Sequence, residues 1–295
     1  MRRVVFFLLT NFAVLLVLGV VMAVLTRLGV LPELGGTGEY VPLFLFSLVW
    51  GFGGSIISLF LSKGMARRSV GARTITQPSN PTEAWLMETV ARQAQQAGIK
   101  MPELAIYDAP EMNAFATGAS KNSSLVAVST GLLRGMTKDE VEGVLAHEVM
   151  HAANGDMVTM ALLQGVLNAF VIFASRVIGG IIDSALSGNG RRNGRGFGYW
   201  IAVMVLEAVF GIVATMVAMW FSRKREFRAD AGAAQLEGPD KMIAALQRLQ
   251  SSAPPQLPAS VSAFGILGNV KSLLASHPPL PVRIAALQSV PKRFN

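Results

Sequence analysis

Two uninterrupted apolar stretches lie in the first part of the chain, from Val4 to Thr26 and from Tyr40 to Ser62. Each is uncharged for more than the roughly 20 residues that a helix needs to cross a bilayer. Two arginines precede the first stretch, as in a signal peptide, but its apolar run is too long and ends without a small-x-small cleavage site. The pattern therefore predicts an N-terminal transmembrane hairpin over residues 1–62, with spans at about 4–26 and 40–62.

Two further apolar stretches each contain one charged residue: Arg176 within Met157 to Ile182, and Glu207 within Phe197 to Phe221. Their length predicts two more transmembrane helices, in a second hairpin over residues 157–221. In such a hairpin Arg176 and Glu207 fall at similar depth, so we expect them to pair as a polar clip between the helices. A functional role for an acid inside the membrane is the alternative.

The polar sequence between the hairpins shows the patterns of shorter helices and strands. A helix is predicted from Thr82, a capping residue, to Ala97, with Gly98 ending it. Short strands are predicted at Leu104 to Tyr107, at Asn113 to Ala119 and at Ser124 to Ser129. This part of the chain is therefore expected to form a small α+β unit.

The composition agrees with a membrane protein, because 52% of the 295 residues are hydrophobic and only 15% are charged. Most of the net charge of +8 flanks the spans, which implies attraction to anionic lipid headgroups and no nucleic-acid partner. Lys and Arg near span ends favour the cytoplasmic side, which predicts cytoplasmic catalytic parts at residues 63–156 and 222–295. The loop holding Arg191, Arg192 and Arg195 opposes this rule, since it would lie outside.

The segment His147-Glu148-Val149-Met150-His151 places two of the three histidines four residues apart. Residues i and i+4 share a helix face, so both imidazoles can hold one cation while Glu148 reaches a water molecule beside it. A catalytic zinc takes a third protein ligand and leaves its fourth position to water. Because the chain has no cysteine, the third ligand must be His, Glu or Asp.

A helix around this segment is expected from its ends. Thr137 and Glu140 form the pattern of a capping box, and Asn154-Gly155 supplies a break.

Glu226 and Asp230 share a helix face directly after the fourth apolar stretch. His151 lies about five residues before the third stretch and Glu226 about five after the fourth, so at about 1.5 Å per residue both fall within roughly 8 Å of the same membrane face. We therefore expect Glu226 to be the third ligand and Asp230 to orient an imidazole. In a site with three ligands, His277 is expected to hydrogen-bond the oxyanion of the transition state.

The predicted strand that begins with Asn113, Ala114, Phe115 and Ala116 admits two interpretations. It is either an ordinary edge strand or one that pairs with an extended substrate by strand addition.

Together these features resemble the HtpX family of bacterial membrane zinc metalloproteases and, more distantly, the type I CAAX prenyl proteases. The resemblance covers essentially the whole chain and rests on Arg68 to Gly71, Asn113 to Gly118, Val126 to Leu133, His147 to Asp156, Trp220 to Asp230, His277 to Leu280, and Arg283-Ile284. It implies zinc ligands His147, His151 and Glu226. It also implies Glu148 as catalytic base and Asp230 in contact with a ligand. The location it implies is the bacterial inner membrane, with a quality-control role under stress.

The expected fold is an α+β membrane protein with four transmembrane helices and a mainly helical, zincin-like cytoplasmic catalytic domain that contains a small β-sheet. The expected activity is hydrolysis of misfolded or damaged membrane proteins at the cytoplasmic face, with one Zn²⁺ per chain. One alternative is an intramembrane-cleaving zinc protease, which the charged helix start at Lys138-Asp139-Glu140 disfavours. Another is a non-catalytic membrane scaffold, whose structural zinc would have four protein ligands.

Overall fold

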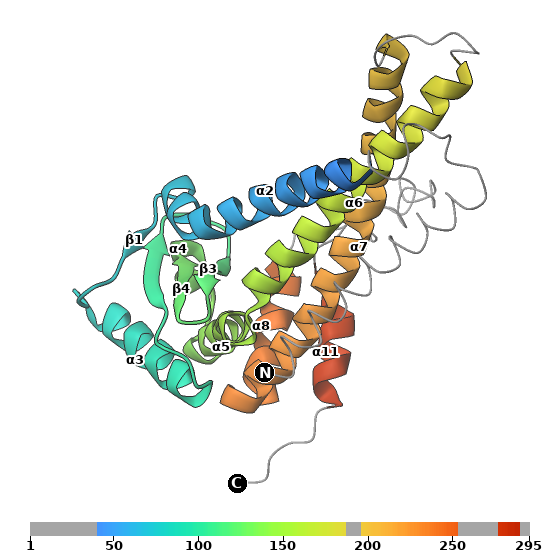
Figure 1. Ribbon diagram of the computed structural model, residues 1–295. Coiled ribbons are helices and arrows are strands. Elements are labelled where there is room, and N and C mark those ends of the chain that lie inside the picture. Colours follow the sequence, from blue (N-terminus) through green and yellow to red (C-terminus); the bar gives the residue numbers. More distant parts are fainter. Residues whose placement is uncertain (1–39, 187–195, 253–276, 290–295) are drawn as a thin grey trace. The chain divides into compact units, whose positions relative to one another are not determined.

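The computed structural model describes residues 40–186, 196–252 and 277–289, which form two compact units (Figure 1). One unit holds the described residues up to 57 and those from 161 to 218, and the other holds the remainder. Helices α2 (Tyr40–Ser69), α6 (Asp156–Leu186) and α7 (Phe197–Glu237) contribute residues to both units.

Within the described ranges, α2, α6 and α7 are the three helices long and apolar enough to cross a membrane. The 31 residues of α6 and the 41 of α7 give lengths of about 46 and 61 Å, more than the roughly 30 Å of a hydrocarbon core. The apolar helices expected at 40–62, 157–182 and 197–221 are thus confirmed. The predicted span at 4–26 lies outside the described residues.

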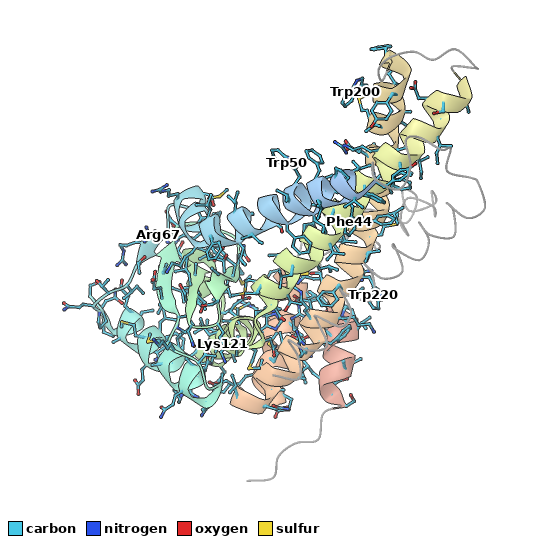
Figure 2. The ribbon with its side chains drawn as sticks, in the orientation of Figure 1. Phe44, Trp50, Arg67, Lys121, Trp200 and Trp220 are labelled. Carbon is cyan, nitrogen blue, oxygen red and sulfur yellow. The ribbon has the colours of Figure 1, made fainter. Side chains whose placement is uncertain are left out.

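Close backbone contacts and ring packing join the helices of the first unit. A Cβ added to Gly51 would meet the backbone nitrogen of Ala169 at 2.5 Å, so α2 and α6 touch where only glycine fits. The ring of Phe44 (Figure 2) packs edge-to-face on Phe173 with centroids 5.8 Å apart. On the outer faces Trp50 and Trp200 are exposed among other large apolar side chains, as expected for surfaces that meet lipid (Figure 2).

The polar clip expected between the apolar helices is confirmed. An Arg176 Nη1 donates to Glu207 Oε1 at 2.7 Å and also to the backbone oxygen of Ile172 at 3.1 Å. The guanidinium lies over the ring of Phe46, 5.7 Å from its centroid. Arg176 and Glu207 thus neutralise each other inside the apolar unit.

A four-stranded mixed sheet lies in the second unit, with strand order β1-β2-β4-β3. The strands are β1 (Arg73–Thr74), β2 (Glu103–Tyr107), β3 (Ala114–Ser120) and β4 (Ser123–Ser129). β2 and β4 are parallel, whereas β1 pairs with β2 and β3 with β4 in antiparallel fashion. The three predicted strands are confirmed, and β1 is a short addition that periodicity did not indicate.

Four helices of this unit contribute to one core with the sheet. Leu104 and Val126 from the sheet pack in one buried cluster with Leu86 of α3 (Pro81–Gln96) and Leu145 of α5 (Lys138–Asn154). Leu132 of α4 (Thr130–Gly135) and Ala245 of α8 (Pro239–Ser252) belong to the same cluster, and α11 (Leu280–Gln288) also lies in this unit. The cluster fixes α5 against the sheet by burying its apolar face.

The predicted start of α3 at Thr82 is wrong. The N-cap is Asn80, whose side-chain oxygen accepts the backbone N–H of Glu83. Pro81 occupies the first helical position, where its fixed φ and missing N–H cost nothing, and this places the cap one residue before the proline. The predicted end is confirmed, with Ala97 as C-cap and Gly98 at a φ of 68°.

Candidate metal centre

Helix α5 carries the H-E-x-x-H segment, and local signals define both of its ends. Thr137 and Glu140 form the expected capping box. Gly155 ends the helix with a φ of 67°, a left-handed conformation that favours glycine, and α6 begins at the next residue. His147 and His151 share one face of this helix, and their rings meet edge-to-face with centroids 4.5 Å apart.

Helix α7 continues without a break from its apolar part through Glu226 and Asp230. Both carboxylates are buried, each only 2% exposed. They lie four residues apart and therefore on one face of the helix, as the sequence predicts.

Three donor atoms converge between the two helices. His147 Nε2 and His151 Nε2 lie 3.0 Å apart, and the Glu226 carboxylate oxygens lie 3.5 and 3.2 Å from them respectively. Zinc bonds of about 2.0–2.2 Å in tetrahedral geometry require donors about 3.3–3.6 Å apart. Among the residues that the structure describes, these three form the group able to hold a metal ion. Their donor atoms lie at this spacing or a few tenths of an ångström inside it, so a zinc-sized cation requires only a small outward shift of the donors.

The other nitrogen of each imidazole contacts a carboxylate. His147 Nδ1 lies 2.9 Å from Asp230 Oδ1, and His151 Nδ1 lies 2.7 Å from Asp156 Oδ2. Each contact places the ring proton on Nδ1 and leaves Nε2 as the electron donor. Asp230 therefore lies where the sequence places it, beside an imidazole, whereas Asp156 received no role from the sequence.

Arg283 of α11 is a second residue whose place the sequence did not reveal. Its guanidinium donates to both oxygens of Asp230, at 2.8 and 2.6 Å, and Nη1 lies 3.4 Å from Glu226. The side chain is buried, and a buried arginine requires an acidic partner. The need for an acidic partner could have drawn attention to Arg283. The sequence does not show which acid that partner is, because Asp230 is 53 residues away in the chain.

His277 and Glu148 lie at the edge of the three donors. His277 Nδ1 is 2.7 Å from Glu226 Oε2, and its side chain is 62% exposed, so it contacts a ligand and is not one of the three donors. Glu148 is half-buried on α5, next to His147, and its carboxylate has no hydrogen-bond partner among the described residues.

The sequence profile of peptidase family M48 matches residues 80–290, which include every residue of this centre. This chain belongs to peptidase family M48.

Two relatives match this chain over nearly their whole length. Protease HtpX of Xanthomonas campestris pv. campestris (strain B100) is 63% identical over 98% of this chain and 97% of its own. Protease HtpX of Xanthomonas oryzae pv. oryzae (strain MAFF 311018) is 62% identical with the same coverage. The expected resemblance to the HtpX family is confirmed, and the chain is a membrane metalloprotease.

The crystal structure of S. mikatae Ste24p shares the fold, with a TM-score of 0.56 at 19% identity. The match covers 90% of this chain and 66% of that one. The mostly helical architecture with a small mixed sheet is thus similar to the fold of Ste24p.

Hydrogen bonds within the M48 centre outweigh the effect of burial on its pKa values. Burial alone would lower the pKa of His151, but Asp156 and Glu226 raise it to about 10. Burial opposes ionisation of Glu226 too, yet contacts with His147, His151 and His277 hold its pKa far below the usual range. Protons and a cation compete for the same imidazoles, so metal binding releases protons.

The strand expected beside the centre is the edge strand β3. Asn113 precedes it. The backbone N–H of Asn113 donates to Ser129 Oγ, and the backbone oxygen of Asn113 accepts from the N–H of Ser129. Ala114 and Ala116 pack against the core cluster that includes α5, while the ring of Phe115 contacts Tyr107 on the other face of the sheet. In the described part of the chain β3 pairs with β4 alone, so its second edge has no strand partner there.

Proposed function

We propose that the chain is a zinc-dependent endopeptidase in which His147, His151 and Glu226 hold one Zn²⁺. The observation that carries this proposal is the convergence of their donor atoms at 3.0 to 3.5 Å. When bound, zinc polarises the scissile carbonyl and lowers the pKa of the attacking water. Asp230, which contacts His147 and accepts from Arg283, keeps that imidazole oriented.

Glu148 is the general base in this proposal. Its carboxylate accepts a proton from the attacking water and then delivers that proton to the leaving amine. Its place on α5 beside His147, half-buried and without a competing hydrogen bond in the described residues, supports the role. His277 donates to the oxyanion from the ring nitrogen that does not contact Glu226.

The substrates in this proposal are misfolded or damaged membrane proteins of the bacterial inner membrane, cleaved at the cytoplasmic face as part of a stress response. An extended substrate segment pairs with the free edge of β3 near Ala114. Support comes from the apolar helices α6 and α7, which directly adjoin the ligand segments in the chain. Basic residues in the last turn of α2, including Arg67 (Figure 2), and directly after the apolar part of α7 favour the cytoplasmic side for the metal centre.

The two alternatives are less well supported. An intramembrane-cleaving protease would hold H-E-x-x-H in an apolar span, whereas α5 begins with three charged residues and is not one of the candidate spans. A structural zinc site would need four protein ligands, whereas the described residues supply three. Membership of a peptidase family favours the enzyme.

The test is the variant Glu148→Gln in the full-length protein, purified in detergent. We expect zinc content equal to that of the parent and a loss of casein cleavage of about 10²- to 10⁴-fold, because the base is removed and the ligands remain. Glu88→Gln, an exposed glutamate of α3, is the matched control and should keep both properties. Turnover by Glu148→Gln equal to that of the parent, or cleavage by the parent that survives a chelator, would refute the proposal.

A further inference from the structure

Asp156 is the most completely enclosed acid of the centre. It is the first residue of α6 and follows directly after Gly155, which ends α5. Its exposure is 0%, and each side-chain oxygen has its own partner. Oδ2 lies 2.7 Å from His151 Nδ1, and Oδ1 accepts a hydrogen bond of 2.6 Å from Arg228.

Two arginines of α7 hold this residue. Arg228 bonds its side chain, and Arg225 donates to its backbone oxygen at 3.3 Å and to Ser222 Oγ at 3.0 Å. The helix that supplies Glu226 therefore also fixes the acid that contacts His151. A buried carboxylate is costly without compensation, and here an arginine and the N-terminus of α6 both compensate it.

The contact has a definite consequence for the imidazole. A carboxylate that accepts from Nδ1–H fixes the tautomer and the ring orientation, and it increases the basicity of Nε2. On His147 the same arrangement is made by Asp230 with Arg283. Both imidazoles of the centre are thus held by a carboxylate that is in turn held by an arginine.

We propose that Asp156, held by Arg228, is a positioning residue that aims Nε2 of His151 at the metal. This inference rests on the proposed function, because it takes His151 to be a zinc ligand. A merely structural acid at the start of α6 would need only one oxygen, to accept a backbone N–H of that helix. The use of both oxygens by side chains, one of them an imidazole, assigns the further role.

The experiment measures zinc affinity of the full-length protein in detergent, by competition with a chelator. Asp156→Ala should lower the affinity by about 10- to 100-fold, and Asp156→Asn, which keeps an acceptor oxygen, by less. The ligand-field absorption of the Co²⁺-substituted protein should change in Asp156→Ala, because the donor geometry at His151 changes. Arg228 is 41% exposed on its side chain, so Arg228→Gln should fold normally and show a smaller loss of the same kind.

Glu83→Gln is the matched control, because Glu83 is another buried carboxylate held by an arginine, Arg73, in the same unit. It should lower thermal stability and leave zinc affinity and the Co²⁺ spectrum unchanged. The inference is overturned if Asp156→Ala and Arg228→Gln both bind zinc within about two-fold of the parent, or if Glu83→Gln loses as much affinity as they do. His151→Ala separates the two proposals: if it binds zinc as tightly as the parent, the proposed function itself fails.

Discussion

The buried carboxylates of this protein differ in role according to the groups that neutralise their charge. Glu226, Asp230 and Asp156 are at most 2% exposed, and each contacts an imidazole and a cationic or ring nitrogen. Burial of an unpaired carboxylate costs several kcal/mol, so removal of one partner affects the others. The three acids therefore differ in function according to whether their oxygens face Nε2 or Nδ1 of a histidine.

Replacement of the third ligand tests this distinction. Glu226→Ala should lower zinc occupancy as strongly as His147→Ala, because each removes one of three protein donors. Asp230→Ala should be milder, with a loss on the order of 10- to 100-fold in affinity, because it removes only the partner of Nδ1. Metal analysis after dialysis distinguishes them. Stoichiometric, tightly held zinc in Glu226→Ala would show that another carboxylate is the ligand.

Glu83 gives a pH-dependent prediction away from the metal. The backbone N–H of Ser79, the Arg73 guanidinium and the Ser79 hydroxyl lower the pKa of Glu83 from 4.5 to about 2. A lowered pKa in the folded state stabilises the fold above pH 4.5 and loses its effect as the pH falls toward 2. The difference in melting temperature between the parent and Glu83→Gln should therefore be largest near neutral pH and shrink between those values. A difference that stays constant across this range would contradict the assignment.

The arginines that the sequence missed share one property, which is a distant partner. Arg228 is 72 residues from Asp156, and Arg283 is 53 residues from Asp230. Spacing within one helix reveals pairs such as His147 and His151, because they share a face. Such spacing gives no information on which arginine of another helix contacts the site.

At the scale of elements, local chemistry explains the helix ends well. The capping box before α5 and the glycine after it involve residues within four positions of each other, so the sequence predicted both. At α3 two capping residues competed, and Pro81 decided between them. The short elements β1 and α4 were not predicted, because two and six residues are too few to show a period.

Close helix contacts give a prediction at this scale. A Cβ on Gly143 of α5 would meet the backbone oxygen of Lys241 in α8 at 2.8 Å, and backbone cannot rotate away as a side chain can. Gly143→Ala should therefore destabilise the protein by about 1–3 kcal/mol and displace the helix that carries both histidines. Thermal unfolding in detergent, with zinc content as a second measurement, tests it.

Gly64 of α2 is the matched control, because nothing lies within 4 Å of a Cβ added there. Gly64→Ala should stabilise the protein by about 0.5–1 kcal/mol, as alanine does in an open helix position. Equal melting temperatures for both variants would show that α5 and α8 do not approach so closely.

At the scale of the whole molecule, some features are evident in the sequence and others are not. Apolar helices are evident in the sequence because a bilayer requires about 20 uncharged residues, and α2, α6 and α7 confirm this. The three residues proposed as ligands could be predicted because the segments that hold them adjoin these helices in the sequence. α7 runs unbroken from its apolar part to Glu237, so the segment with Glu226 and Asp230 continues the apolar helix.

Membrane topology is the prediction that concerns the whole chain. The ligands His151 and Glu226 flank α6 and the apolar part of α7, so both ends of that segment must lie on one side of the membrane. Along α7, Phe197 is 29 residues from Glu226, or about 44 Å, which exceeds the hydrocarbon core of roughly 30 Å. A crossing helix therefore places Phe197 on the side opposite the metal centre.

The chain has no native cysteine, so single cysteines can report each side in intact cells. Phe197→Cys, at a position 82% exposed, should react with a membrane-impermeant thiol reagent from outside. Ser252→Cys, at the end of α8, should react only after lysis. The basic residues Arg191, Arg192 and Arg195 oppose this topology, but two crossings bury both apolar helices in lipid, and charge bias is a tendency that hydrophobic burial outweighs. Labelling at residue 197 only after lysis would instead place the turn between α6 and α7 on the cytoplasmic side.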